Sequence, residues 1–171
     1  MPAAGPTPVT ISCLELADPA ALRPPTRPPR RDFEVELAGE PAVNRWFYER
    51  VGRDFSWTDR LAWSEERWRT WARRVETWIA TVEGERAGYF ELEPRGGSVQ
   101  IAYFGLLSTY QGLGIGGHLL TRALRRALEL GRPVRVHTNT LDGPHALDNY
   151  RARGMRIVGR RTEARLIAQP G

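Results

Sequence analysis

The longest regular pattern of apolar positions lies in the middle of the chain, over residues 99–130. An apolar run over 99–107 predicts a buried strand, and glycines follow it at positions 112, 114, 116 and 117. Leucines 119, 120, 124 and 128 then recur at helical spacing, which predicts an amphipathic helix. Glycines let backbone N–H groups approach a ligand, and a helix N-terminus carries partial positive charge. This order of elements therefore predicts an anion site at Gly112 to Gly117.

The remaining pattern predicts an α/β arrangement around that strand. Alternating positions predict strands over 9–16 and 33–37, and a hairpin over 77–93 that turns at Gly84-Glu85. Helices are predicted over 41–51, from Ser64 onward with Trp68 and Trp71 facing the core, and over 144–153. A strand is predicted over 134–140, and two closing strands over 155–159 and 162–168, the last at an edge. The glycine-rich loop is thereby placed at the end of the central strand.

A Pro/Arg-rich connection at about 18–31 interrupts the early pattern. It carries five prolines among four arginines, and proline fixes φ and removes backbone donors. An extended surface segment is therefore expected. A stiff connection between two strands is favoured over a ligand for a proline-binding domain.

Composition narrows the class of protein. A chain of 171 residues without repeats fits one domain over 1–171, and all 25 basic residues are arginine, which with abundant Ala, Gly and Pro indicates GC-rich coding. The net charge of +5 is therefore weak evidence for nucleic acid, and we expect no such partner. The start of the chain lacks a signal-peptide pattern and no apolar run reaches membrane-spanning length, so we expect a cytoplasmic protein without a membrane partner.

Metal and disulfide chemistry are not expected. Cys13 is the single cysteine, which excludes an internal disulfide and a cysteine-based zinc site. His118, His137 and His145 do not have the spacing of metal ligands.

The glycine-rich loop is not that of a nucleotide hydrolase or a dinucleotide fold. The chain has no lysine for a GxxxxGK[ST] loop, and its glycines do not have GxGxxG spacing. The pattern Gln111-x-x-Gly114-x-Gly116 resembles the Q/R-x-x-G-x-G/A signature of the GNAT N-acetyltransferase superfamily. Downstream, Ala146-x-x-x-Tyr150 followed by Gly154 is similar to that family's A-x-x-x-Y-x-x-x-G-F ending.

The resemblance implies a GNAT-like mixed, mostly antiparallel central sheet, flanked by helices and splayed at the central strand. It implies acetyl-CoA as co-substrate, with its pyrophosphate on the loop amides and its pantetheine arm paired with the central strand. Gly105 is the residue best suited to the bulge that splays this strand. The candidate CoA-binding residues lie on the strand, the loop and two later elements: Gly105, Leu106, Leu107, Gln111, Gly112, Leu113, Gly114, Ile115, Gly116, Gly117, Asn139, Asn149 and Tyr150.

For catalysis, the resemblance implies Tyr150 as the acid that protonates the departing thiolate, which suits a phenol with a pKa near 10. The base stays open. Some family members carry a glutamate ten residues before the signature, where this chain has Ile101. Glu91 on the preceding strand is the first candidate, followed by His137 and by Tyr103, which simple alternation places on the same face as Ile101.

The acceptor site is expected in the segment between the first two helices. Its aromatic residues are unusual for a connection, and by resemblance this segment forms one lip of the acceptor site. The candidates for substrate contact are Phe55, Trp57, Asp59 and Arg60, together with Tyr103. A structural ion pair between Asp59 and Arg60 is the alternative.

The function expected from these features is acetyl-CoA-dependent N-acetylation of a primary amine, of a small molecule, by direct transfer in a ternary complex. Three alternatives stay open. One is a protein or peptide N-acetyltransferase. Another is a degenerate acetyl-CoA-binding regulator of a partner protein, favoured by Ile101. The third is a nucleic-acid factor that uses the Pro/Arg-rich segment. The final strand offers an edge for a homodimer.

Overall fold

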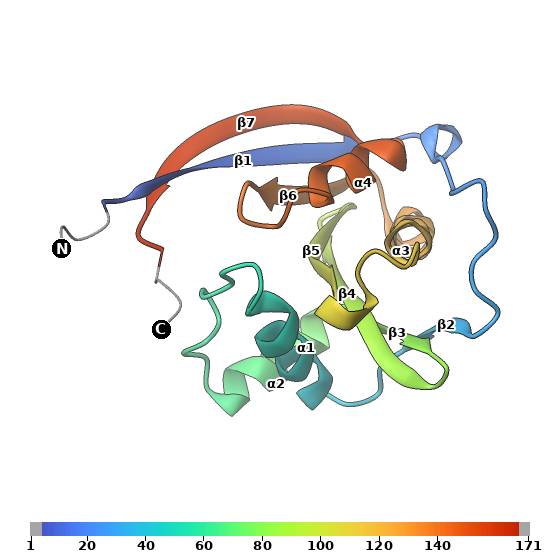
Figure 1. Cartoon of the computed structure of the whole chain (residues 1–171), viewed down its shortest axis with the longest axis horizontal. Helices are drawn as coiled ribbons and strands as arrows, with labels where there is room; N and C mark the ends of the chain where they lie inside the picture. Colours follow the sequence, from blue (N-terminus) through green and yellow to red (C-terminus); the bar gives the residue numbers. More distant parts are fainter. Residues whose placement is uncertain (1–4, 168–171) are drawn as a thin grey trace.

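The computed structural model describes residues 5–167, which form one seven-stranded sheet with helices against both faces (Figure 1). The strands are β1 (Thr7–Leu16), β2 (Phe33–Leu37), β3 (Glu76–Val82), β4 (Glu85–Arg95), β5 (Ser98–Leu106), β6 (Val134–Asn139) and β7 (Arg156–Arg165). The helices are α1 (Ala42–Gly52), α2 (Glu65–Arg74), α3 (Gly116–Leu130) and α4 (Ala146–Ala152), with short 3₁₀ turns η1 (Pro19–Ala21) and η2 (Ser108–Tyr110). Within the described part of the chain, none of these helices has the length and apolar character needed to cross a membrane.

The strand order is β2-β3-β4-β5-β6-β1-β7, and β5 and β6 form the parallel pair of the sheet. Their pairing joins Val99–Ile101 to Val134–Val136 and then stops. The other neighbouring strands are antiparallel. The mixed, mostly antiparallel sheet that splays at its central strand is therefore confirmed.

A bulge in β5 stands where the parallel pairing stops. Ile101 lies opposite Leu92 and Tyr103 opposite Glu91, so Ala102 is the extra residue. The expectation of a bulge at Gly105 was wrong, because Gly105 stays in register opposite Tyr89.

Gly105 is a glycine for a different reason. A Cβ at this position would lie 2.5 Å from Val51 Cγ1, so α1 packs directly on the β5 backbone. The bulge also moves Tyr103 to the α1 side, whereas Ile101 belongs to the core under α3. The expectation that Tyr103 and Ile101 share a face was therefore also wrong.

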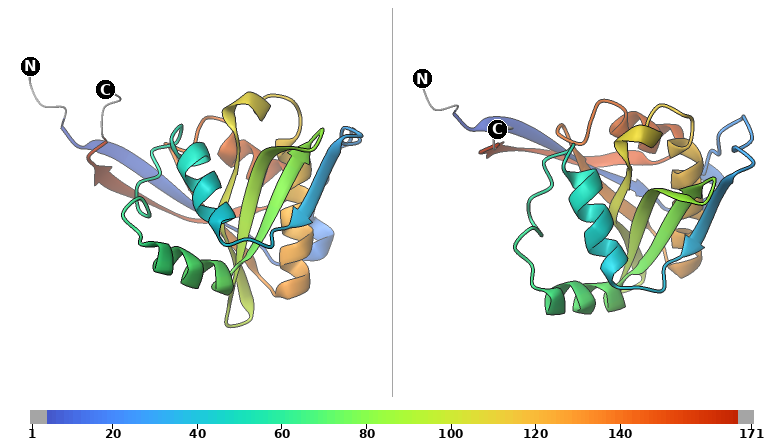
Figure 2. Two further views of the ribbon diagram at one scale, coloured as in Figure 1. Left: turned by 90° about the horizontal axis from the view of Figure 1, so that it is seen from below. Right: turned by 60° about the horizontal axis from the view of Figure 1, so that its bottom comes forward.

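The two faces of the sheet carry different layers (Figure 2). One face is covered by α3, whose apolar stripe packs against alternate residues of β4 and β5 such as Phe90 and Leu92. The other face is covered by α1 and α2, and there Phe47 packs on Tyr89 with ring centroids 4.9 Å apart. Since neighbouring residues of a strand face opposite ways, Glu91 points with Tyr89 to the α1–α2 side.

The first strand does not lie beside the second. β1 is inserted between β6 and β7, while β2 forms the opposite edge of the sheet. The connecting residues 17–32, called the strap below, therefore cross from one half of the sheet to the other and pass outside α3 (Figure 1). The Arg23 N–H donates to the Arg153 carbonyl over 2.9 Å, and the Glu83 N–H donates to the Asp32 carbonyl over 3.1 Å. The strap is thus the expected surface connection between two strands.

The end of the chain forms one strand instead of the two expected over 155–159 and 162–168. β7 pairs with β1 from Thr7 to Glu15, and its register shift leaves Val158 as an extra residue. A bulge absorbs the irregularity without reversing the chain, so no second strand begins. The expected end at Ala168 lies outside the described residues. The β3–β4 hairpin turns at Glu83 and Gly84, which have φ values of 54° and 79°, one residue earlier than predicted.

Candidate active site

A cavity of about 830 Å³ opens where β5 and β6 diverge. Its walls come from β5, β6, the connection between α1 and α2, the start of α3, and the turn that leads into α4. The two sides differ in chemistry. The glycine-rich loop presents backbone, and the rest of the lining presents aromatic rings, two carboxylates, two histidines and Arg165.

The glycine-rich loop forms the polar end of this cavity. Gly112 and Gly114 have φ values of 76° and 77°, a conformation that disfavours residues with a Cβ. Because α3 begins at Gly116, its first N–H groups have no partners within the helix. Gln111, Gly112, Gly116 and Gly117 line the cavity. The loop therefore offers backbone donors and a positive helix end to an anion.

The middle of the loop faces elsewhere. Leu113, Gly114 and Ile115 line a second cavity of about 600 Å³ on the other side of the loop. The Ile115 side chain itself is buried in the core near Val82 and Ala87. The loop thus separates two cavities.

Of the other predicted CoA-binding residues, Leu107 alone lines neither cavity. Gly105 and Leu106 line the larger cavity, but Leu107 does not. The Leu107 N–H donates to the Ala87 carbonyl over 2.8 Å, and its side chain packs in the core under α1. Asn149 lines the cavity and donates from Nδ2 to the Gly116 carbonyl over 3.1 Å. This contact ties α4 to the start of α3.

Tyr150 contributes its phenol to the lining of the cavity. It extends from α4, is 6% exposed, and packs near Phe104 with ring centroids 6.1 Å apart. Burial, and secondarily the charge of Asp142, raises the pKa of Tyr150 well above its ordinary value. The phenol therefore keeps its proton at neutral pH, which a proton donor requires.

Asp142 is a cavity carboxylate that the sequence reasoning missed. It accepts hydrogen bonds from Thr138 Oγ1 over 2.8 Å and from the Asn139 N–H over 2.9 Å. The Trp57 Nε1–H also donates to it over 3.4 Å. An Asp-Gly pair after a strand is typical of a turn, so no local signal distinguishes this aspartate.

Asp59 lies in the connection between α1 and α2, beside aromatic residues that line the cavity. Its Oδ1 accepts hydrogen bonds from the Tyr103 hydroxyl over 2.6 Å and the Tyr48 hydroxyl over 2.8 Å. Burial raises the pKa of both tyrosines, so both stay protonated donors. Phe55, Trp57, Asp59 and Tyr103 all line the cavity, as their candidate role requires. Tyr48 was missed because its helical position is typical of a core residue.

Arg60 and Glu91 do not line the cavity. Arg60 is 5% exposed and Glu91 is 0% exposed, and Arg60 Nη1 lies 2.9 Å from Glu91 Oε1. Glu91 also accepts hydrogen bonds from Trp71 Nε1 over 3.1 Å and from Asn44 Nδ2. The ion pair considered between Asp59 and Arg60 is replaced by this one. Both residues lie where a substrate cannot reach them, so the expectations that Glu91 is the base and that Arg60 contacts the substrate were wrong.

His137 lines the cavity from β6. Partial burial of an otherwise exposed side chain, together with the charges of Arg161 and Arg95, lowers the pKa of His137 below its ordinary value of 6.5. The imidazole is therefore neutral near pH 7 and can accept a proton. Among the described residues, no group of His, Cys, Asp and Glu side chains is placed to hold a metal ion.

Comparisons with known proteins agree with this architecture. A sequence model of the Acetyltransferase (GNAT) family matches residues 41–155, and no curated protein matches. The chain therefore belongs to the GNAT acetyltransferase family.

Solved structures share the fold at low identity. A GCN5-related N-acetyltransferase from Kribbella flavida is 16% identical with a TM-score of 0.62, over 92% of this chain and 58% of that one. A GCN5-related N-acetyltransferase from Sphaerobacter thermophilus is 20% identical with a TM-score of 0.63, over 91% and 51%. A Bacillus subtilis acetyltransferase in complex with CoA is 23% identical with a TM-score of 0.59, over 74% and 78%. The chain spans about half to two thirds of the length of the first structures it matches.

Proposed function

We propose that this protein is an acetyl-CoA-dependent N-acetyltransferase that acetylates a primary amine of a small molecule by direct transfer in a ternary complex. The observation that carries the proposal is the cavity where β5 and β6 diverge. The glycine-rich loop, the group around Asp59 and Tyr150 all line this cavity. A cofactor can enter from the loop side and an acceptor from the aromatic side.

The backbone of this chain supplies the cofactor site. The amides around Gly112 and Gly116 would hold the pyrophosphate of acetyl-CoA. β5 beyond Ile101 is paired with β4 but no longer with β6. Its free edge at Gly105 and Leu106 would pair with the amides of the pantetheine arm as an added strand does.

The cavity side chains would divide the proton transfers. The amine nitrogen attacks the thioester carbonyl carbon, a C–N bond forms, and the C–S bond breaks. The neutral imidazole of His137 takes a proton from the bound ammonium, which leaves the neutral amine that attacks. After the attack the nitrogen loses a second proton, and Tyr150 gives its proton to the thiolate, so that the second proton restores the phenol. The alternative route for the first proton runs through Tyr103, whose hydroxyl oxygen would take it while passing its own proton to Asp59, to which it already donates.

The acceptor side favours a cationic amine with an apolar body. Asp59 and Asp142 place two carboxylates in the cavity wall, and an ammonium group is attracted to them before it loses its proton. Phe55, Trp57 and Tyr103 provide aromatic faces for the rest of the molecule.

The test is Gly114→Trp, with Gly84→Trp as its matched control. Both glycines have similar φ values, 77° and 79°, and open space around the Cβ position, but Gly84 lies in the distant β3–β4 turn. Calorimetry with CoA should show binding to the wild type and the control and none to Gly114→Trp. Thiol release from acetyl-CoA, measured over a panel of small amines, should follow the same pattern. Binding without thiol release for any amine or peptide would favour a regulator over an enzyme.

A further inference from the structure

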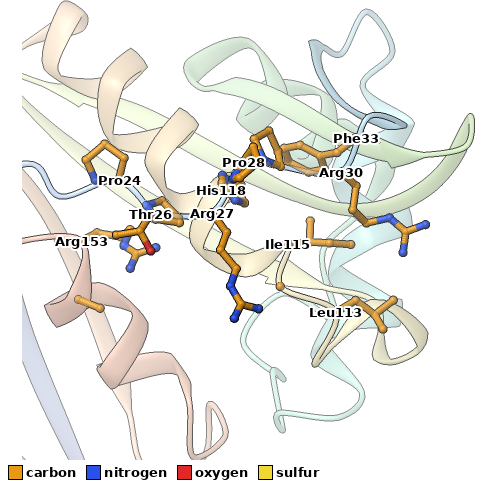
Figure 3. A pocket seen from close by; sticks show the side chains of 14 residues that line it. Pro24, Thr26, Arg27, Pro28, Arg30, Phe33, Leu113, Ile115, His118 and Arg153 are labelled. Carbon is orange, nitrogen blue, oxygen red and sulfur yellow. The ribbon is translucent and has the colours of Figure 1, made fainter.

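The second cavity, of about 600 Å³, lies between the strap and the glycine-rich loop (Figure 3). It is bounded by the Pro/Arg-rich part of the strap, by the start of α3 and by the end of α4. The strap is a motif to which the proposed acetyl transfer gives no role. Its position against Gly114 and Ile115 brings it to the same loop that the larger cavity uses.

The lining of this cavity is cationic. Arg27, Arg30, Arg153 and His118 contribute to it, and none of its lining residues is acidic. Arg30 is neutralised by Asp32, 3.0 Å away, and extends away from Arg27 and Arg153 in Figure 3. No ion pair among the described residues involves Arg27 or Arg153. Two arginines thus share one cavity without a counter-charge.

Arg153 lies at an electrostatically unfavourable place. A Cβ on Gly117 would collide with Arg153 Nη1, so the guanidinium packs against the first turn of α3. This is the positive end of the helix dipole, where a cation is destabilised and an anion is favoured. Arg153 Nε is also buried without a hydrogen-bond partner in the described part of the chain, and burial lowers the pKa of Arg153. A bound anion would offset the repulsion by the helix dipole, offer an acceptor to the buried Arg153 Nε, and stabilise the charged form of Arg153.

The strap is held in place before any ligand arrives. The Arg23 N–H bonds to the Arg153 carbonyl, and Pro25 lies 3.1 Å from the Cβ position of Gly117. A Cβ on Gly154 would collide with the Ala21 carbonyl, so only glycine allows the strap to pack this closely. Prolines restrict the remaining backbone. Arg27 is therefore presented at the cavity with little further loss of backbone entropy on binding.

We propose that the strap completes the cofactor site, with Arg27 and Arg153, assisted by His118, binding the 3′-phosphate on the ribose of CoA. This inference rests on the proposed function. In CoA the pyrophosphate joins the pantetheine arm to a 3′-phosphorylated adenosine. If the arm lies in the larger cavity and the pyrophosphate on the loop, the third phosphate falls on the strap side. The order of the two cavities along the loop matches the order of these groups.

The experiment compares CoA with 3′-dephospho-CoA by calorimetry, on the wild type, Arg27→Gln and Arg31→Gln. Arg31 is an exposed arginine of the same strap outside the cavity lining, so its variant makes the same change of charge. The wild type and Arg31→Gln should bind CoA about tenfold more tightly than dephospho-CoA, since charge-assisted bonds to phosphate are strong. Arg27→Gln should lose most of this preference through weaker CoA binding, with its affinity for dephospho-CoA unchanged.

The opposite results separate the two proposals. Equal wild-type affinities for CoA and dephospho-CoA would overturn the strap subsite and leave the proposed function intact. A preference that Arg27→Gln retains in full would also overturn it. No binding of either compound to the wild type would remove the proposed function, and the strap subsite with it.

Discussion

Asp59 and Arg60 are neighbours in the chain, but they belong to two different clusters of charged and aromatic side chains. The closed cluster surrounds Arg60, whose guanidinium lies within 6 Å of five aromatic rings and pairs with Glu91. The open cluster surrounds Asp59, which faces the cavity with Tyr103 and Trp57. Two tyrosines connect the clusters. The Tyr48 hydroxyl accepts from the Arg60 N–H over 3.0 Å and donates to Asp59 over 2.8 Å, and Tyr103 lies with its ring centroid 4.3 Å from the Arg60 guanidinium while its hydroxyl donates to Asp59.

The difference shows that burial, and not residue type, separates a structural role from a chemical one. A fully buried charge depends on its partners, since removing one of them leaves the other without water or a counter-ion. Both carboxylate oxygens of Glu91 accept hydrogen bonds from side chains of the protein, so neither is available to a ligand. Asp59 receives its described hydrogen bonds at one oxygen, Oδ1, and lines a space that a ligand can enter.

The largest expected effect comes from breaking the closed cluster. Glu91→Ala leaves Arg60 buried without its counter-ion and should lower the free energy of unfolding by about 3–5 kcal/mol. Asp59→Asn, in the open cluster, should change it by less than about 1 kcal/mol, because an amide oxygen can still accept from both tyrosines. Urea unfolding of the two variants measures the contrast. Comparable losses in both would show that the clusters are not distinct.

The next largest effect is expected from two buried tyrosines, of which one lines the cavity and the other does not. Burial raises the pKa of both Tyr150 and Tyr89, but only Tyr150 lines the cavity. Tyr150→Phe should lower kcat by about 100-fold or more and leave CoA affinity unchanged, since it removes a proton donor. Tyr89→Phe should leave kcat unchanged, and because the Tyr89 hydroxyl is buried without a partner among the described residues, it should not reduce stability. Initial rates and calorimetry test both variants, and an unchanged kcat in Tyr150→Phe would exclude Tyr150 as the acid.

The smallest expected effect concerns the cavity residue that would accept a proton from the amine. Only neutral imidazole accepts a proton, and the pKa of His137 lies below 6.5, so kcat/KM should rise as pH increases through that lowered pKa and then level off. His137→Gln should remove this acid limb and lower kcat/KM by about tenfold. His145→Gln, in the same cavity, should retain it. If the limb survives His137→Gln and is lost in Tyr103→Phe, the proton leaves through Tyr103 to Asp59 instead.

Local signals in the sequence predicted most elements because they act within a few residues. Ser64 caps α2 by accepting from the Arg67 N–H over 3.2 Å, and the leucines of α3 form its buried stripe. The glycines at 112 and 114 adopt the positive φ values that their loop requires. The candidates Gly112, Gly116 and Tyr150 consequently lie on one cavity.

The errors arose where a distant segment decides the outcome. A single extra residue at Ala102 reverses the face of Tyr103, and no pattern in the strand marks it. Glu91 looks like a solvated glutamate in an alternating strand until α1 and α2 enclose it with Asn44, Arg60 and Trp71. No local pattern indicates that β1 is inserted between β6 and β7. This insertion is the reason why the strap crosses α3 and reaches the glycine-rich loop.

Hydrophobic periodicity and turn chemistry determine helices, strands and loops, since both depend on neighbours in the chain. Strand register, bulges and the partner of a buried charge depend on segments that meet only after folding. The glycine-rich cradle and its tyrosine could therefore be recognised from residues alone. Which carboxylate faces the cavity, and which arginines face the loop, was decided by packing, because packing sets how far water and ligands can reach each group.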